Sequence, residues 1–167
     1  TVEGGAFDIP TCYEGIEGAT VSIRGGEFAI TSCDDGVNAA GGADGSGVSG
    51  FGGMDEFAAN PNYYVVVDGG ALTINSQGDC IDSNGDVTVN GGTLTLARLP
   101  GNVSDTLLPK GTFTINSGAT LTFSGYNQLG DSTTTPPVVV NKGGVVNSGS
   151  TVTSFKNLTL AGGTLQA

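Results

Sequence analysis

Short runs of alternating apolar and polar residues recur along the chain, and each run ends at a glycine-containing bend. The unit is clearest between Gln77 and Leu96, where VTV is followed by two glycines and then by LTL. Alternation with a period of two is typical of β-strands that bury one face. Glycine permits the bend because it reaches positive φ without steric cost. The pattern therefore predicts two or three short strands per unit and no helix.

This unit repeats at an interval in the low twenties. The residues that close the first strand of each unit are Ile23, Val67, Val89, Ile115, Val140 and Leu160. Successive spacings are 44, 22, 26, 25 and 20 residues, and the long interval contains a glycine-rich segment, about residues 39–62. Such a period is typical of β-solenoids, in which stacked units share one continuous core. We therefore expect one domain over residues 1–167, with about six to seven coils and a loop insertion at about 39–62.

Stacking predicts which residues lie on one another inside the core. Equivalent apolar positions of successive units should form four inward ladders, which are Val21/Val65/Val87/Phe113, Ile23/Val67/Val89/Ile115, Phe28/Leu72/Leu94/Leu121 and Ile30/Ile74/Leu96/Phe123.

Charge is distributed unevenly along the chain. Sixteen acidic residues face five basic ones, and residues 1–105 carry a net charge of −13 while residues 106–167 carry +2. Such a surface is unlikely to bind nucleic acid directly, and it favours cations, basic partners or anionic ligands bridged by a metal. The absence of histidine excludes an imidazole base, a histidine-dependent triad and most zinc sites. No apolar run approaches the roughly 20 residues of a membrane span.

Aligning the turns of three units produces two columns of oxygen donors. Glu14, Asp35 and Asp79 form the first column, and Glu17, Asn38 and Asp82 form the second. The apolar residues between the columns, which should point inward, are Ile16, Val37 and Ile81. Carboxylates stacked about 4.8 Å apart repel by roughly 3 kcal/mol per pair at an effective dielectric of 20. The columns therefore predict a bound hard cation, most simply calcium, and the alternative is a solvated acidic face that keeps the protein soluble.

The cysteines leave two alternatives open. Cys12 and Cys33 lie 21 residues apart and occupy the same place in consecutive units. Stacked positions about 4.8 Å apart fall within the usual Cα separation of a disulfide, so the pair forms either a disulfide or a ladder of two small buried side chains. Cys80 aligns with Gly15 and Gly36 and is predicted to pack alone.

Three motifs resemble a known family, namely CYEGIEGATVSIRGGEFAI, CDDGVNAAGG and GDCIDSNGDVTVNGGTLTL. They are similar to the bacterial calcium-dependent carbohydrate-binding β-helix proteins, a family related in fold to pectate lyases and associated with acidic plant polysaccharide such as polygalacturonate. The resemblance covers about Cys12 to Tyr126. It implies an all-β, single-stranded right-handed parallel β-helix at an extracellular or cell-surface location. It also implies calcium held by the turn carboxylates Glu14, Glu17, Asp34, Asp35, Asp79 and Asp82, with Asn38 in the second column. The chain departs from the family at the next unit, where residues 106–110 read TLLPK instead of an acidic turn.

Of the possible functions, we favour non-catalytic, calcium-dependent binding of acidic polysaccharide, with calcium bridging protein and uronate carboxylates. Tyr13, Tyr63 and Tyr64 offer stacking surfaces for sugar rings, although each is also suited to packing. Arg24, the basic residue within the acidic units, is a further carbohydrate-binding candidate, and its other role is to neutralise nearby carboxylates.

Two alternatives remain. A calcium-dependent polysaccharide lyase needs a base, and the basic residues available are Arg24, Arg98, Lys110, Lys142 and Lys156. A structural or ice-binding solenoid would use ladders of outward hydroxyl residues, Thr73/Thr95/Thr122 and Ser22/Thr88/Thr114. Binding without cleavage is favoured because bases are few near the acidic turns, and because a hydroxyl ladder leaves the acidic columns unexplained.

Overall fold

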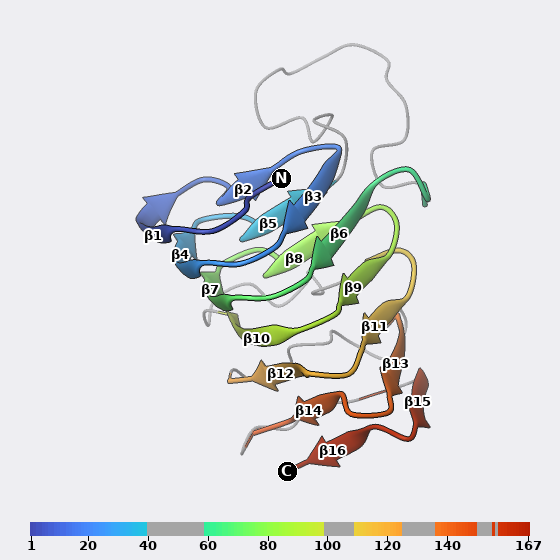
Figure 1. Ribbon diagram of the computed structural model, residues 1–167. Coiled ribbons are helices and arrows are strands. Elements are labelled where there is room, and N and C mark those ends of the chain that lie inside the picture. Colours follow the sequence, from blue (N-terminus) through green and yellow to red (C-terminus); the bar gives the residue numbers. More distant parts are fainter. Residues whose placement is uncertain (40–58, 99–108, 125–135, 150–154, 156) are drawn as a thin grey trace.

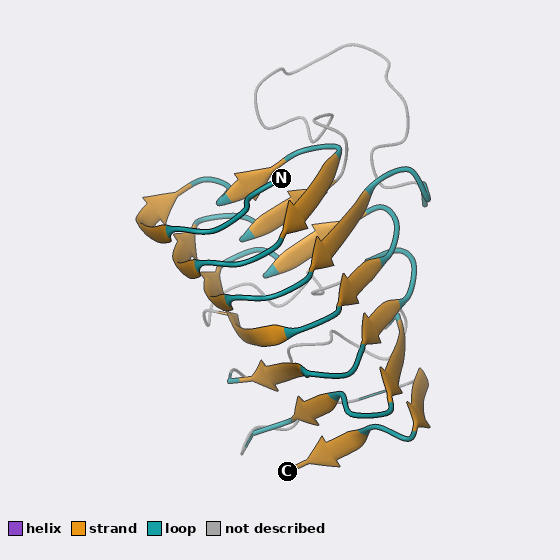
Figure 2. Cartoon of the chain, in the orientation of Figure 1, coloured by secondary structure: helices purple, strands orange, loops and turns teal. Residues whose placement is uncertain are grey.

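The computed structural model describes residues 1–39, 59–98, 109–124, 136–149, 155 and 157–167, and these ranges contain strands and no helix (Figures 1 and 2). Both outcomes agree with the period-two pattern. Because the glycine-rich insertion predicted at about 39–62 falls largely on residues 40–58, most of it lies outside the described residues.

The largest sheet has seven strands, which are hydrogen-bonded in the order β1-β4-β7-β10-β12-β14-β16. Their bounds are β1 (Ala6–Cys12), β4 (Glu27–Ser32), β7 (Ala71–Ser76), β10 (Gly92–Arg98), β12 (Ala119–Phe123), β14 (Val145–Asn147) and β16 (Thr164–Gln166).

A six-stranded sheet has the order β15-β13-β11-β9-β6-β3, and a three-stranded sheet has the order β2-β5-β8. The strands of the six-stranded sheet are β3 (Thr20–Ile23), β6 (Tyr64–Val67), β9 (Val87–Val89), β11 (Phe113–Ile115), β13 (Pro137–Asn141) and β15 (Asn157–Ala161). Those of the three-stranded sheet are β2 (Ile16–Glu17), β5 (Val37–Ala39) and β8 (Ile81–Ser83).

The chain enters the sheets in a fixed order. From β2 to β10 it passes from the three-stranded to the six-stranded and then to the seven-stranded sheet, three times in succession. Every pairing between named strands is parallel, and each strand inside a sheet pairs with its counterparts from the preceding and the following passage. The two termini therefore lie at opposite ends of the stack (Figure 1).

All four predicted ladders are confirmed by the strand registers. Val21, Val65, Val87 and Phe113 pair in sequence, and the other three ladders follow the same registers. These side chains form one cluster in which Phe113 and Phe123 are completely buried. The residues that closed each unit also stack, since Val140 pairs with Ile115 before it and Leu160 after it.

The ends of the stack are less well covered than its middle. Phe7 on β1 stacks on Phe28 with ring centroids 4.7 Å apart, and Phe7 remains 38% exposed. At the other end, Leu160 and Leu165 are exposed. Burial is therefore greatest midway along the stack.

A row of amide side chains follows the six-stranded sheet where each strand ends, a feature that the pattern analysis did not identify. Asn90 Nδ2 donates to Asp68 Oδ1 over 2.8 Å, Asn116 Nδ2 donates to Asn90 Oδ1 over 2.7 Å, and Asn141 Nδ2 donates to Asn116 Oδ1 over 2.7 Å. An amide carries both donor and acceptor, so identical side chains can bond along the stack. In the sequence, this row could have been found from the asparagine that directly follows the triplets VTV, FTI and VVV.

Candidate functional site

Three successive turns lead from the seven-stranded sheet to the three-stranded sheet and carry most of the predicted ligands. We call the set Glu14, Asp34, Asp35 and Asp79 the acidic corner. The N–H of Gly15 donates to Asp35 O over 3.1 Å, and that of Gly36 donates to Asp79 O over 2.8 Å. These bonds hold neighbouring turns at equivalent positions, so the first predicted column, Glu14/Asp35/Asp79, is confirmed as a stack of turns.

The second predicted column is also in register. Glu17 pairs with Asn38, and Asn38 pairs with Asp82. The intervening apolar residues point inward as expected, because Val37 and Ile81 are buried and Ile16 is half-buried against the core.

Close approach of the backbones explains the small residues within these turns. A Cβ on Gly36 would collide with Ile74 Cγ2 and would lie 2.7 Å from Cys80 O, while a Cβ on Gly15 would collide with Gly36 O. Glycine at both positions therefore allows the turns to stack directly. This local packing brings the carboxylates of separate repeats together.

Donors within the corner offset part of the repulsion that the columns predict. Asn38 Nδ2 donates to Glu14 Oε1 over 3.2 Å, and the Asp79 N–H donates to Asp35 Oδ1 over 2.7 Å. Asn38 is only 2% exposed. These two hydrogen bonds therefore give Glu14 and Asp35 donors within the corner itself.

Two carboxylates of the acidic corner converge above Gly78. A Cβ placed on Gly78 would lie 2.6 Å from Asp34 Oδ1 and 2.6 Å from Asp35 Oδ1. The absence of a side chain at this position leaves a cradle lined by two anionic oxygens. We call this feature the Gly78 cradle.

The donor chemistry of the cradle fits a hard cation. Carboxylate oxygens are the preferred ligands of calcium, which takes six to eight oxygens at about 2.3–2.6 Å. In the described ranges, no group of three or more cysteine, aspartate or glutamate side chains is arranged to hold a metal ion. A cation at the cradle would therefore draw its remaining ligands from water, backbone carbonyls or a bound molecule.

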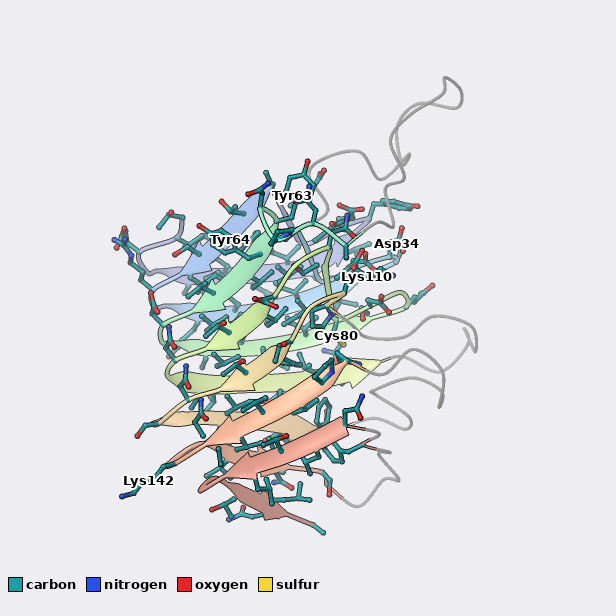
Figure 3. All side chains as sticks on the ribbon, turned by 90° about the vertical axis from the view of Figure 1, so that its right-hand side faces the viewer. Asp34, Tyr63, Tyr64, Cys80, Lys110 and Lys142 are labelled. Carbon is teal, nitrogen blue, oxygen red and sulfur yellow. The ribbon has the colours of Figure 1, made fainter. Side chains whose placement is uncertain are left out.

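Lys110 lies at the end of the second column and was not part of the predicted site. Its N–H donates to Ser83 O over 2.7 Å, and Pro109 bridges Ser83. Figure 3 shows Lys110 at the same edge of the molecule as Asp34, whereas Lys142 lies at the opposite side. The segment TLLPK has no acidic turn, and its last residue, Lys110, places its ammonium group near the Asp82 carboxylate.

Burial dominates the titration of Asp82. Removal from solvent raises the pKa of Asp82, the nearby Lys110 ammonium and a Ser83 backbone hydrogen bond oppose this shift, and the Asp34 carboxylate reinforces it. The charged form of Asp82 is consequently less favourable in the folded protein than in the unfolded chain.

Replacing Asp82 by asparagine should therefore stabilise the cation-free protein at neutral pH. A raised folded pKa means that proton binding stabilises the fold, and this contribution is lost as the pH rises from the ordinary value of 3.8 through the raised value. In chelator, Asp82→Asn should raise Tm at pH 7, and the gain should shrink toward pH 4. A gain that is equal at both pH values would contradict the burial of a charged Asp82.

The other predicted carbohydrate-binding residues lie at three different corners. Tyr13 adjoins the acidic corner, because it directly precedes Glu14 and its carbonyl accepts from the Asp34 N–H over 3.0 Å, and it is 58% exposed. Tyr63 and Tyr64 lie where the chain enters the six-stranded sheet, and Tyr64 is also exposed. Arg24 follows β3 at the third corner and forms an exposed ion pair with Glu3 at 2.8 Å. Arg24 therefore neutralises Glu3, in line with its alternative role, and Lys110 is the basic residue that acts on Asp82.

The insertion leaves and rejoins the stack beside the second column. Ala39, at its start, pairs with Ser83, and the N–H of Asn60, near its end, donates to Asn84 O over 2.6 Å. Both ends therefore flank β8, next to Asp82.

Of the two alternatives for the cysteine pair, the ladder of two buried side chains is wrong, because Cys33 is exposed. In the structure Cys12 and Cys33 are free thiols, so no disulfide joins them in this state. Cys80 is completely buried and packs alone, as predicted.

These features define the class of the protein, which is all-β with three parallel sheets and carries a row of acidic turns along the smallest sheet. Residues 1–167 match the family described as carbohydrate-binding domain-containing protein, and the chain belongs to that family. This membership supports carbohydrate binding. The chain matches no curated protein and no solved structure. In the part of the chain that the structure describes, no helix could cross a membrane.

Proposed function

We propose that this protein binds acidic polysaccharide, such as polygalacturonate, through calcium held at the acidic corner, and does not cleave it. The observation that carries this proposal is the convergence of Asp34 and Asp35 on the Gly78 cradle. Family membership supports a carbohydrate as the ligand, and a cation held at the cradle would favour a carbohydrate that carries carboxylates.

The scaffold in this proposal is a right-handed parallel β-helix whose three sheets are its faces. The repeated order in which the chain enters the sheets supports this architecture. The hand follows from a general rule, because connections between parallel strands of one sheet are right-handed in about 98% of cases. Each turn of such a helix adds one member to every column.

The negative charge of the protein requires a cation between the acidic corner and an acidic polysaccharide. The net charge of −13 on residues 1–105 repels a polyanion unless cations lie between the two. When bound, calcium supplies positive charge and free coordination positions that uronate oxygens can fill. Asp34 and Asp35 would hold the ion, while Glu14, Glu17, Asn38, Asp79 and Asp82 extend the oxygen-rich surface along the stack.

Tyr13 is the aromatic side chain best placed to contact a sugar bound there. It precedes Glu14 directly, and its carbonyl accepts a hydrogen bond from the Asp34 N–H. Among the large apolar side chains that the structure describes, that of Tyr13 is the most exposed. An amphipathic ring at the edge of a polar site can cover the apolar face of a sugar while keeping its hydroxyl in water. Tyr63, Tyr64 and Arg24 lie at other corners and are secondary candidates.

A polysaccharide lyase is the second candidate function, because Lys110 lies near the second column. A uronate lyase needs a base near the cation, and Lys110 is the basic residue that approaches the second column. Arg24 is less suitable because it lies at another corner and pairs with Glu3. We favour binding because bases are few near the acidic turns.

An ice-binding surface has weaker support. Thr73, Thr95 and Thr122 do stack in register on the seven-stranded sheet. The predicted second hydroxyl ladder is wrong, because Val66 lies between Ser22 and Thr88.

A location outside the cell remains part of the proposal, since plant cell-wall polysaccharide and millimolar calcium are found there.

The test is sedimentation with insoluble, crosslinked polygalacturonate, in calcium and in chelator. Wild type should bind only in calcium, and Asp34→Asn/Asp35→Asn should bind at least about tenfold more weakly, equivalent to about 1.4 kcal/mol. The matched control is Asp8→Asn/Asp68→Asn, which makes the same change in charge at exposed positions away from the acidic corner. The control should bind as wild type does.

Three results would count against the proposal. Binding that persists in chelator contradicts the calcium bridge. Equal losses in the two double variants would mean that overall charge, rather than the cradle, governs binding. Calcium-dependent formation of unsaturated product that disappears in Lys110→Ala would establish the lyase.

A further inference from the structure

The first two repeats carry a pair of thiols beside the acidic corner that the proposed function does not use. Cys12 ends β1, and Cys33 directly follows β4, the strand that pairs with β1. The Cys33 N–H donates to Cys12 O over 2.9 Å, so the two backbones are in contact at these residues. The registered partner of Cys12 is Ser32, so Cys33 lies one residue further along the chain. One strand spacing of about 4.8 Å and one residue of about 3.3 Å along the strand place the two cysteine Cα atoms roughly 5.8 Å apart, within the range of about 4.4–6.8 Å that a disulfide spans.

The Cys12 thiol already points across the gap between the repeats. Its Sγ donates to Thr31 O over 3.3 Å, and Thr31 lies on β4, two residues before Cys33. Pairing requires the two side chains to turn toward each other, and the backbones that carry them are already hydrogen-bonded.

The three thiols differ in access. Cys33 is exposed and Cys12 is half-buried, whereas Cys80 is completely buried and receives a hydrogen bond from Ser76 Oγ at 3.2 Å. Because thiol–disulfide exchange requires access to the attacking sulfur, Cys33 is the first to react and Cys80 takes no part.

We propose that Cys12 and Cys33 are a cross-linking site that closes to a disulfide by exchange with a small disulfide such as oxidised glutathione. The Cys33 thiolate attacks one glutathione sulfur, forms a mixed disulfide and releases one glutathione thiolate. The Cys12 thiolate then attacks Cys33 Sγ and releases the second. The protein loses two electrons and two protons, and oxidised glutathione gains them as two thiols.

The cross-link ties together the chain segments that begin the first two acidic turns. It closes a 21-residue separation and restricts the unfolded chain. Loops of about this length give substantial stabilisation, so oxidation should raise Tm by about 5–10 °C. The inference is independent of carbohydrate and calcium.

The full chain should be incubated with oxidised glutathione, alkylated, and digested with trypsin without reduction. Trypsin cleaves after Arg24 and Arg98, so the bond should join peptide 1–24 to peptide 25–98, and the intact mass should fall by two hydrogen atoms. Because peptide 25–98 also contains Cys80, the digest is repeated on Cys80→Ala, which should give the same joined pair. Reduction should reverse the rise in Tm.

Cys12→Ser and Cys33→Ser distinguish the proposal from general oxidation. Cys12→Ser should retain glutathione on Cys33, because the resolving thiol is missing, and neither variant should show the oxidation-dependent rise in Tm. The proposal is overturned if wild type keeps both thiols open to alkylation, or if it accumulates glutathione on Cys33 without closing the bond. A link between Cys12 and Cys80 would overturn it as well.

Discussion

Phe113→Ala should lower the free energy of unfolding by about 3–5 kcal/mol, the usual cost of emptying a buried phenylalanine site. Phe113 is completely buried and stacks between two valines, Val87 and Val138. Valine side chains on both sides cannot fill the cavity without moving their strands. At about 2–4 °C per kcal/mol for a chain of this size, Tm should fall by about 6–20 °C.

Phe7→Ala is the matched control, because it removes the same atoms at the end of the stack. Phe7 is 38% exposed and has a single stacking partner, Phe28. Its loss should cost less than half as much as the loss of Phe113. Equal costs in thermal or urea unfolding would contradict a core whose burial increases toward the middle of the stack.

Calcium should stabilise the protein strongly if it binds at the Gly78 cradle. A ligand that binds only the folded state adds about 2.7 kcal/mol at a hundredfold excess over its dissociation constant. Relief of repulsion between Asp34 and Asp35 is the physical source of this gain. Thermal melting in calcium should therefore occur about 5–11 °C above melting in chelator.

The controls for this effect are a second metal and a second variant. Magnesium should restore Tm poorly because it requires a tighter octahedral arrangement of ligands. Asp34→Asn/Asp35→Asn should melt at nearly the same temperature in calcium and in chelator. If wild type itself shows no difference, the acidic corner is a solvated surface.

The strand registers could be predicted because the same physical constraint acts at every repeat. A one-residue slip would turn each buried ladder toward solvent, so the spacing of apolar triplets is sufficient to align Ile23, Val67 and Val89. The first and second acidic columns follow from that alignment, since Gly15 and Gly36 force the turns into direct contact. Periodicity therefore carries information about both core and turns.

Other features depend on where side chains point around the stack, which periodicity does not specify. Arg24 shares the repeats of the acidic turns but lies at another corner, while Lys110 approaches Asp82 from the following repeat. The convergence of Asp34 and Asp35 also depends on a missing side chain at Gly78, one repeat away. These relationships arise between repeats, so the pattern within a single unit does not reveal them.

The central claim is that one calcium ion contacts the protein and the polysaccharide together, and thermodynamic linkage tests it directly. If calcium strengthens glycan binding by some factor, the glycan must strengthen calcium binding by the same factor. The measurement is calorimetric titration of calcium into the protein, with and without a saturating short oligogalacturonate. Heat from calcium binding to the oligosaccharide alone is subtracted.

Calcium should bind at least about fivefold more tightly when the oligosaccharide is present, a coupling of about 1 kcal/mol. In Asp34→Asn/Asp35→Asn this coupling should disappear, while Asp8→Asn/Asp68→Asn should retain it. Equal calcium affinity with and without the oligosaccharide in the wild-type protein would contradict a calcium bridge at the acidic corner.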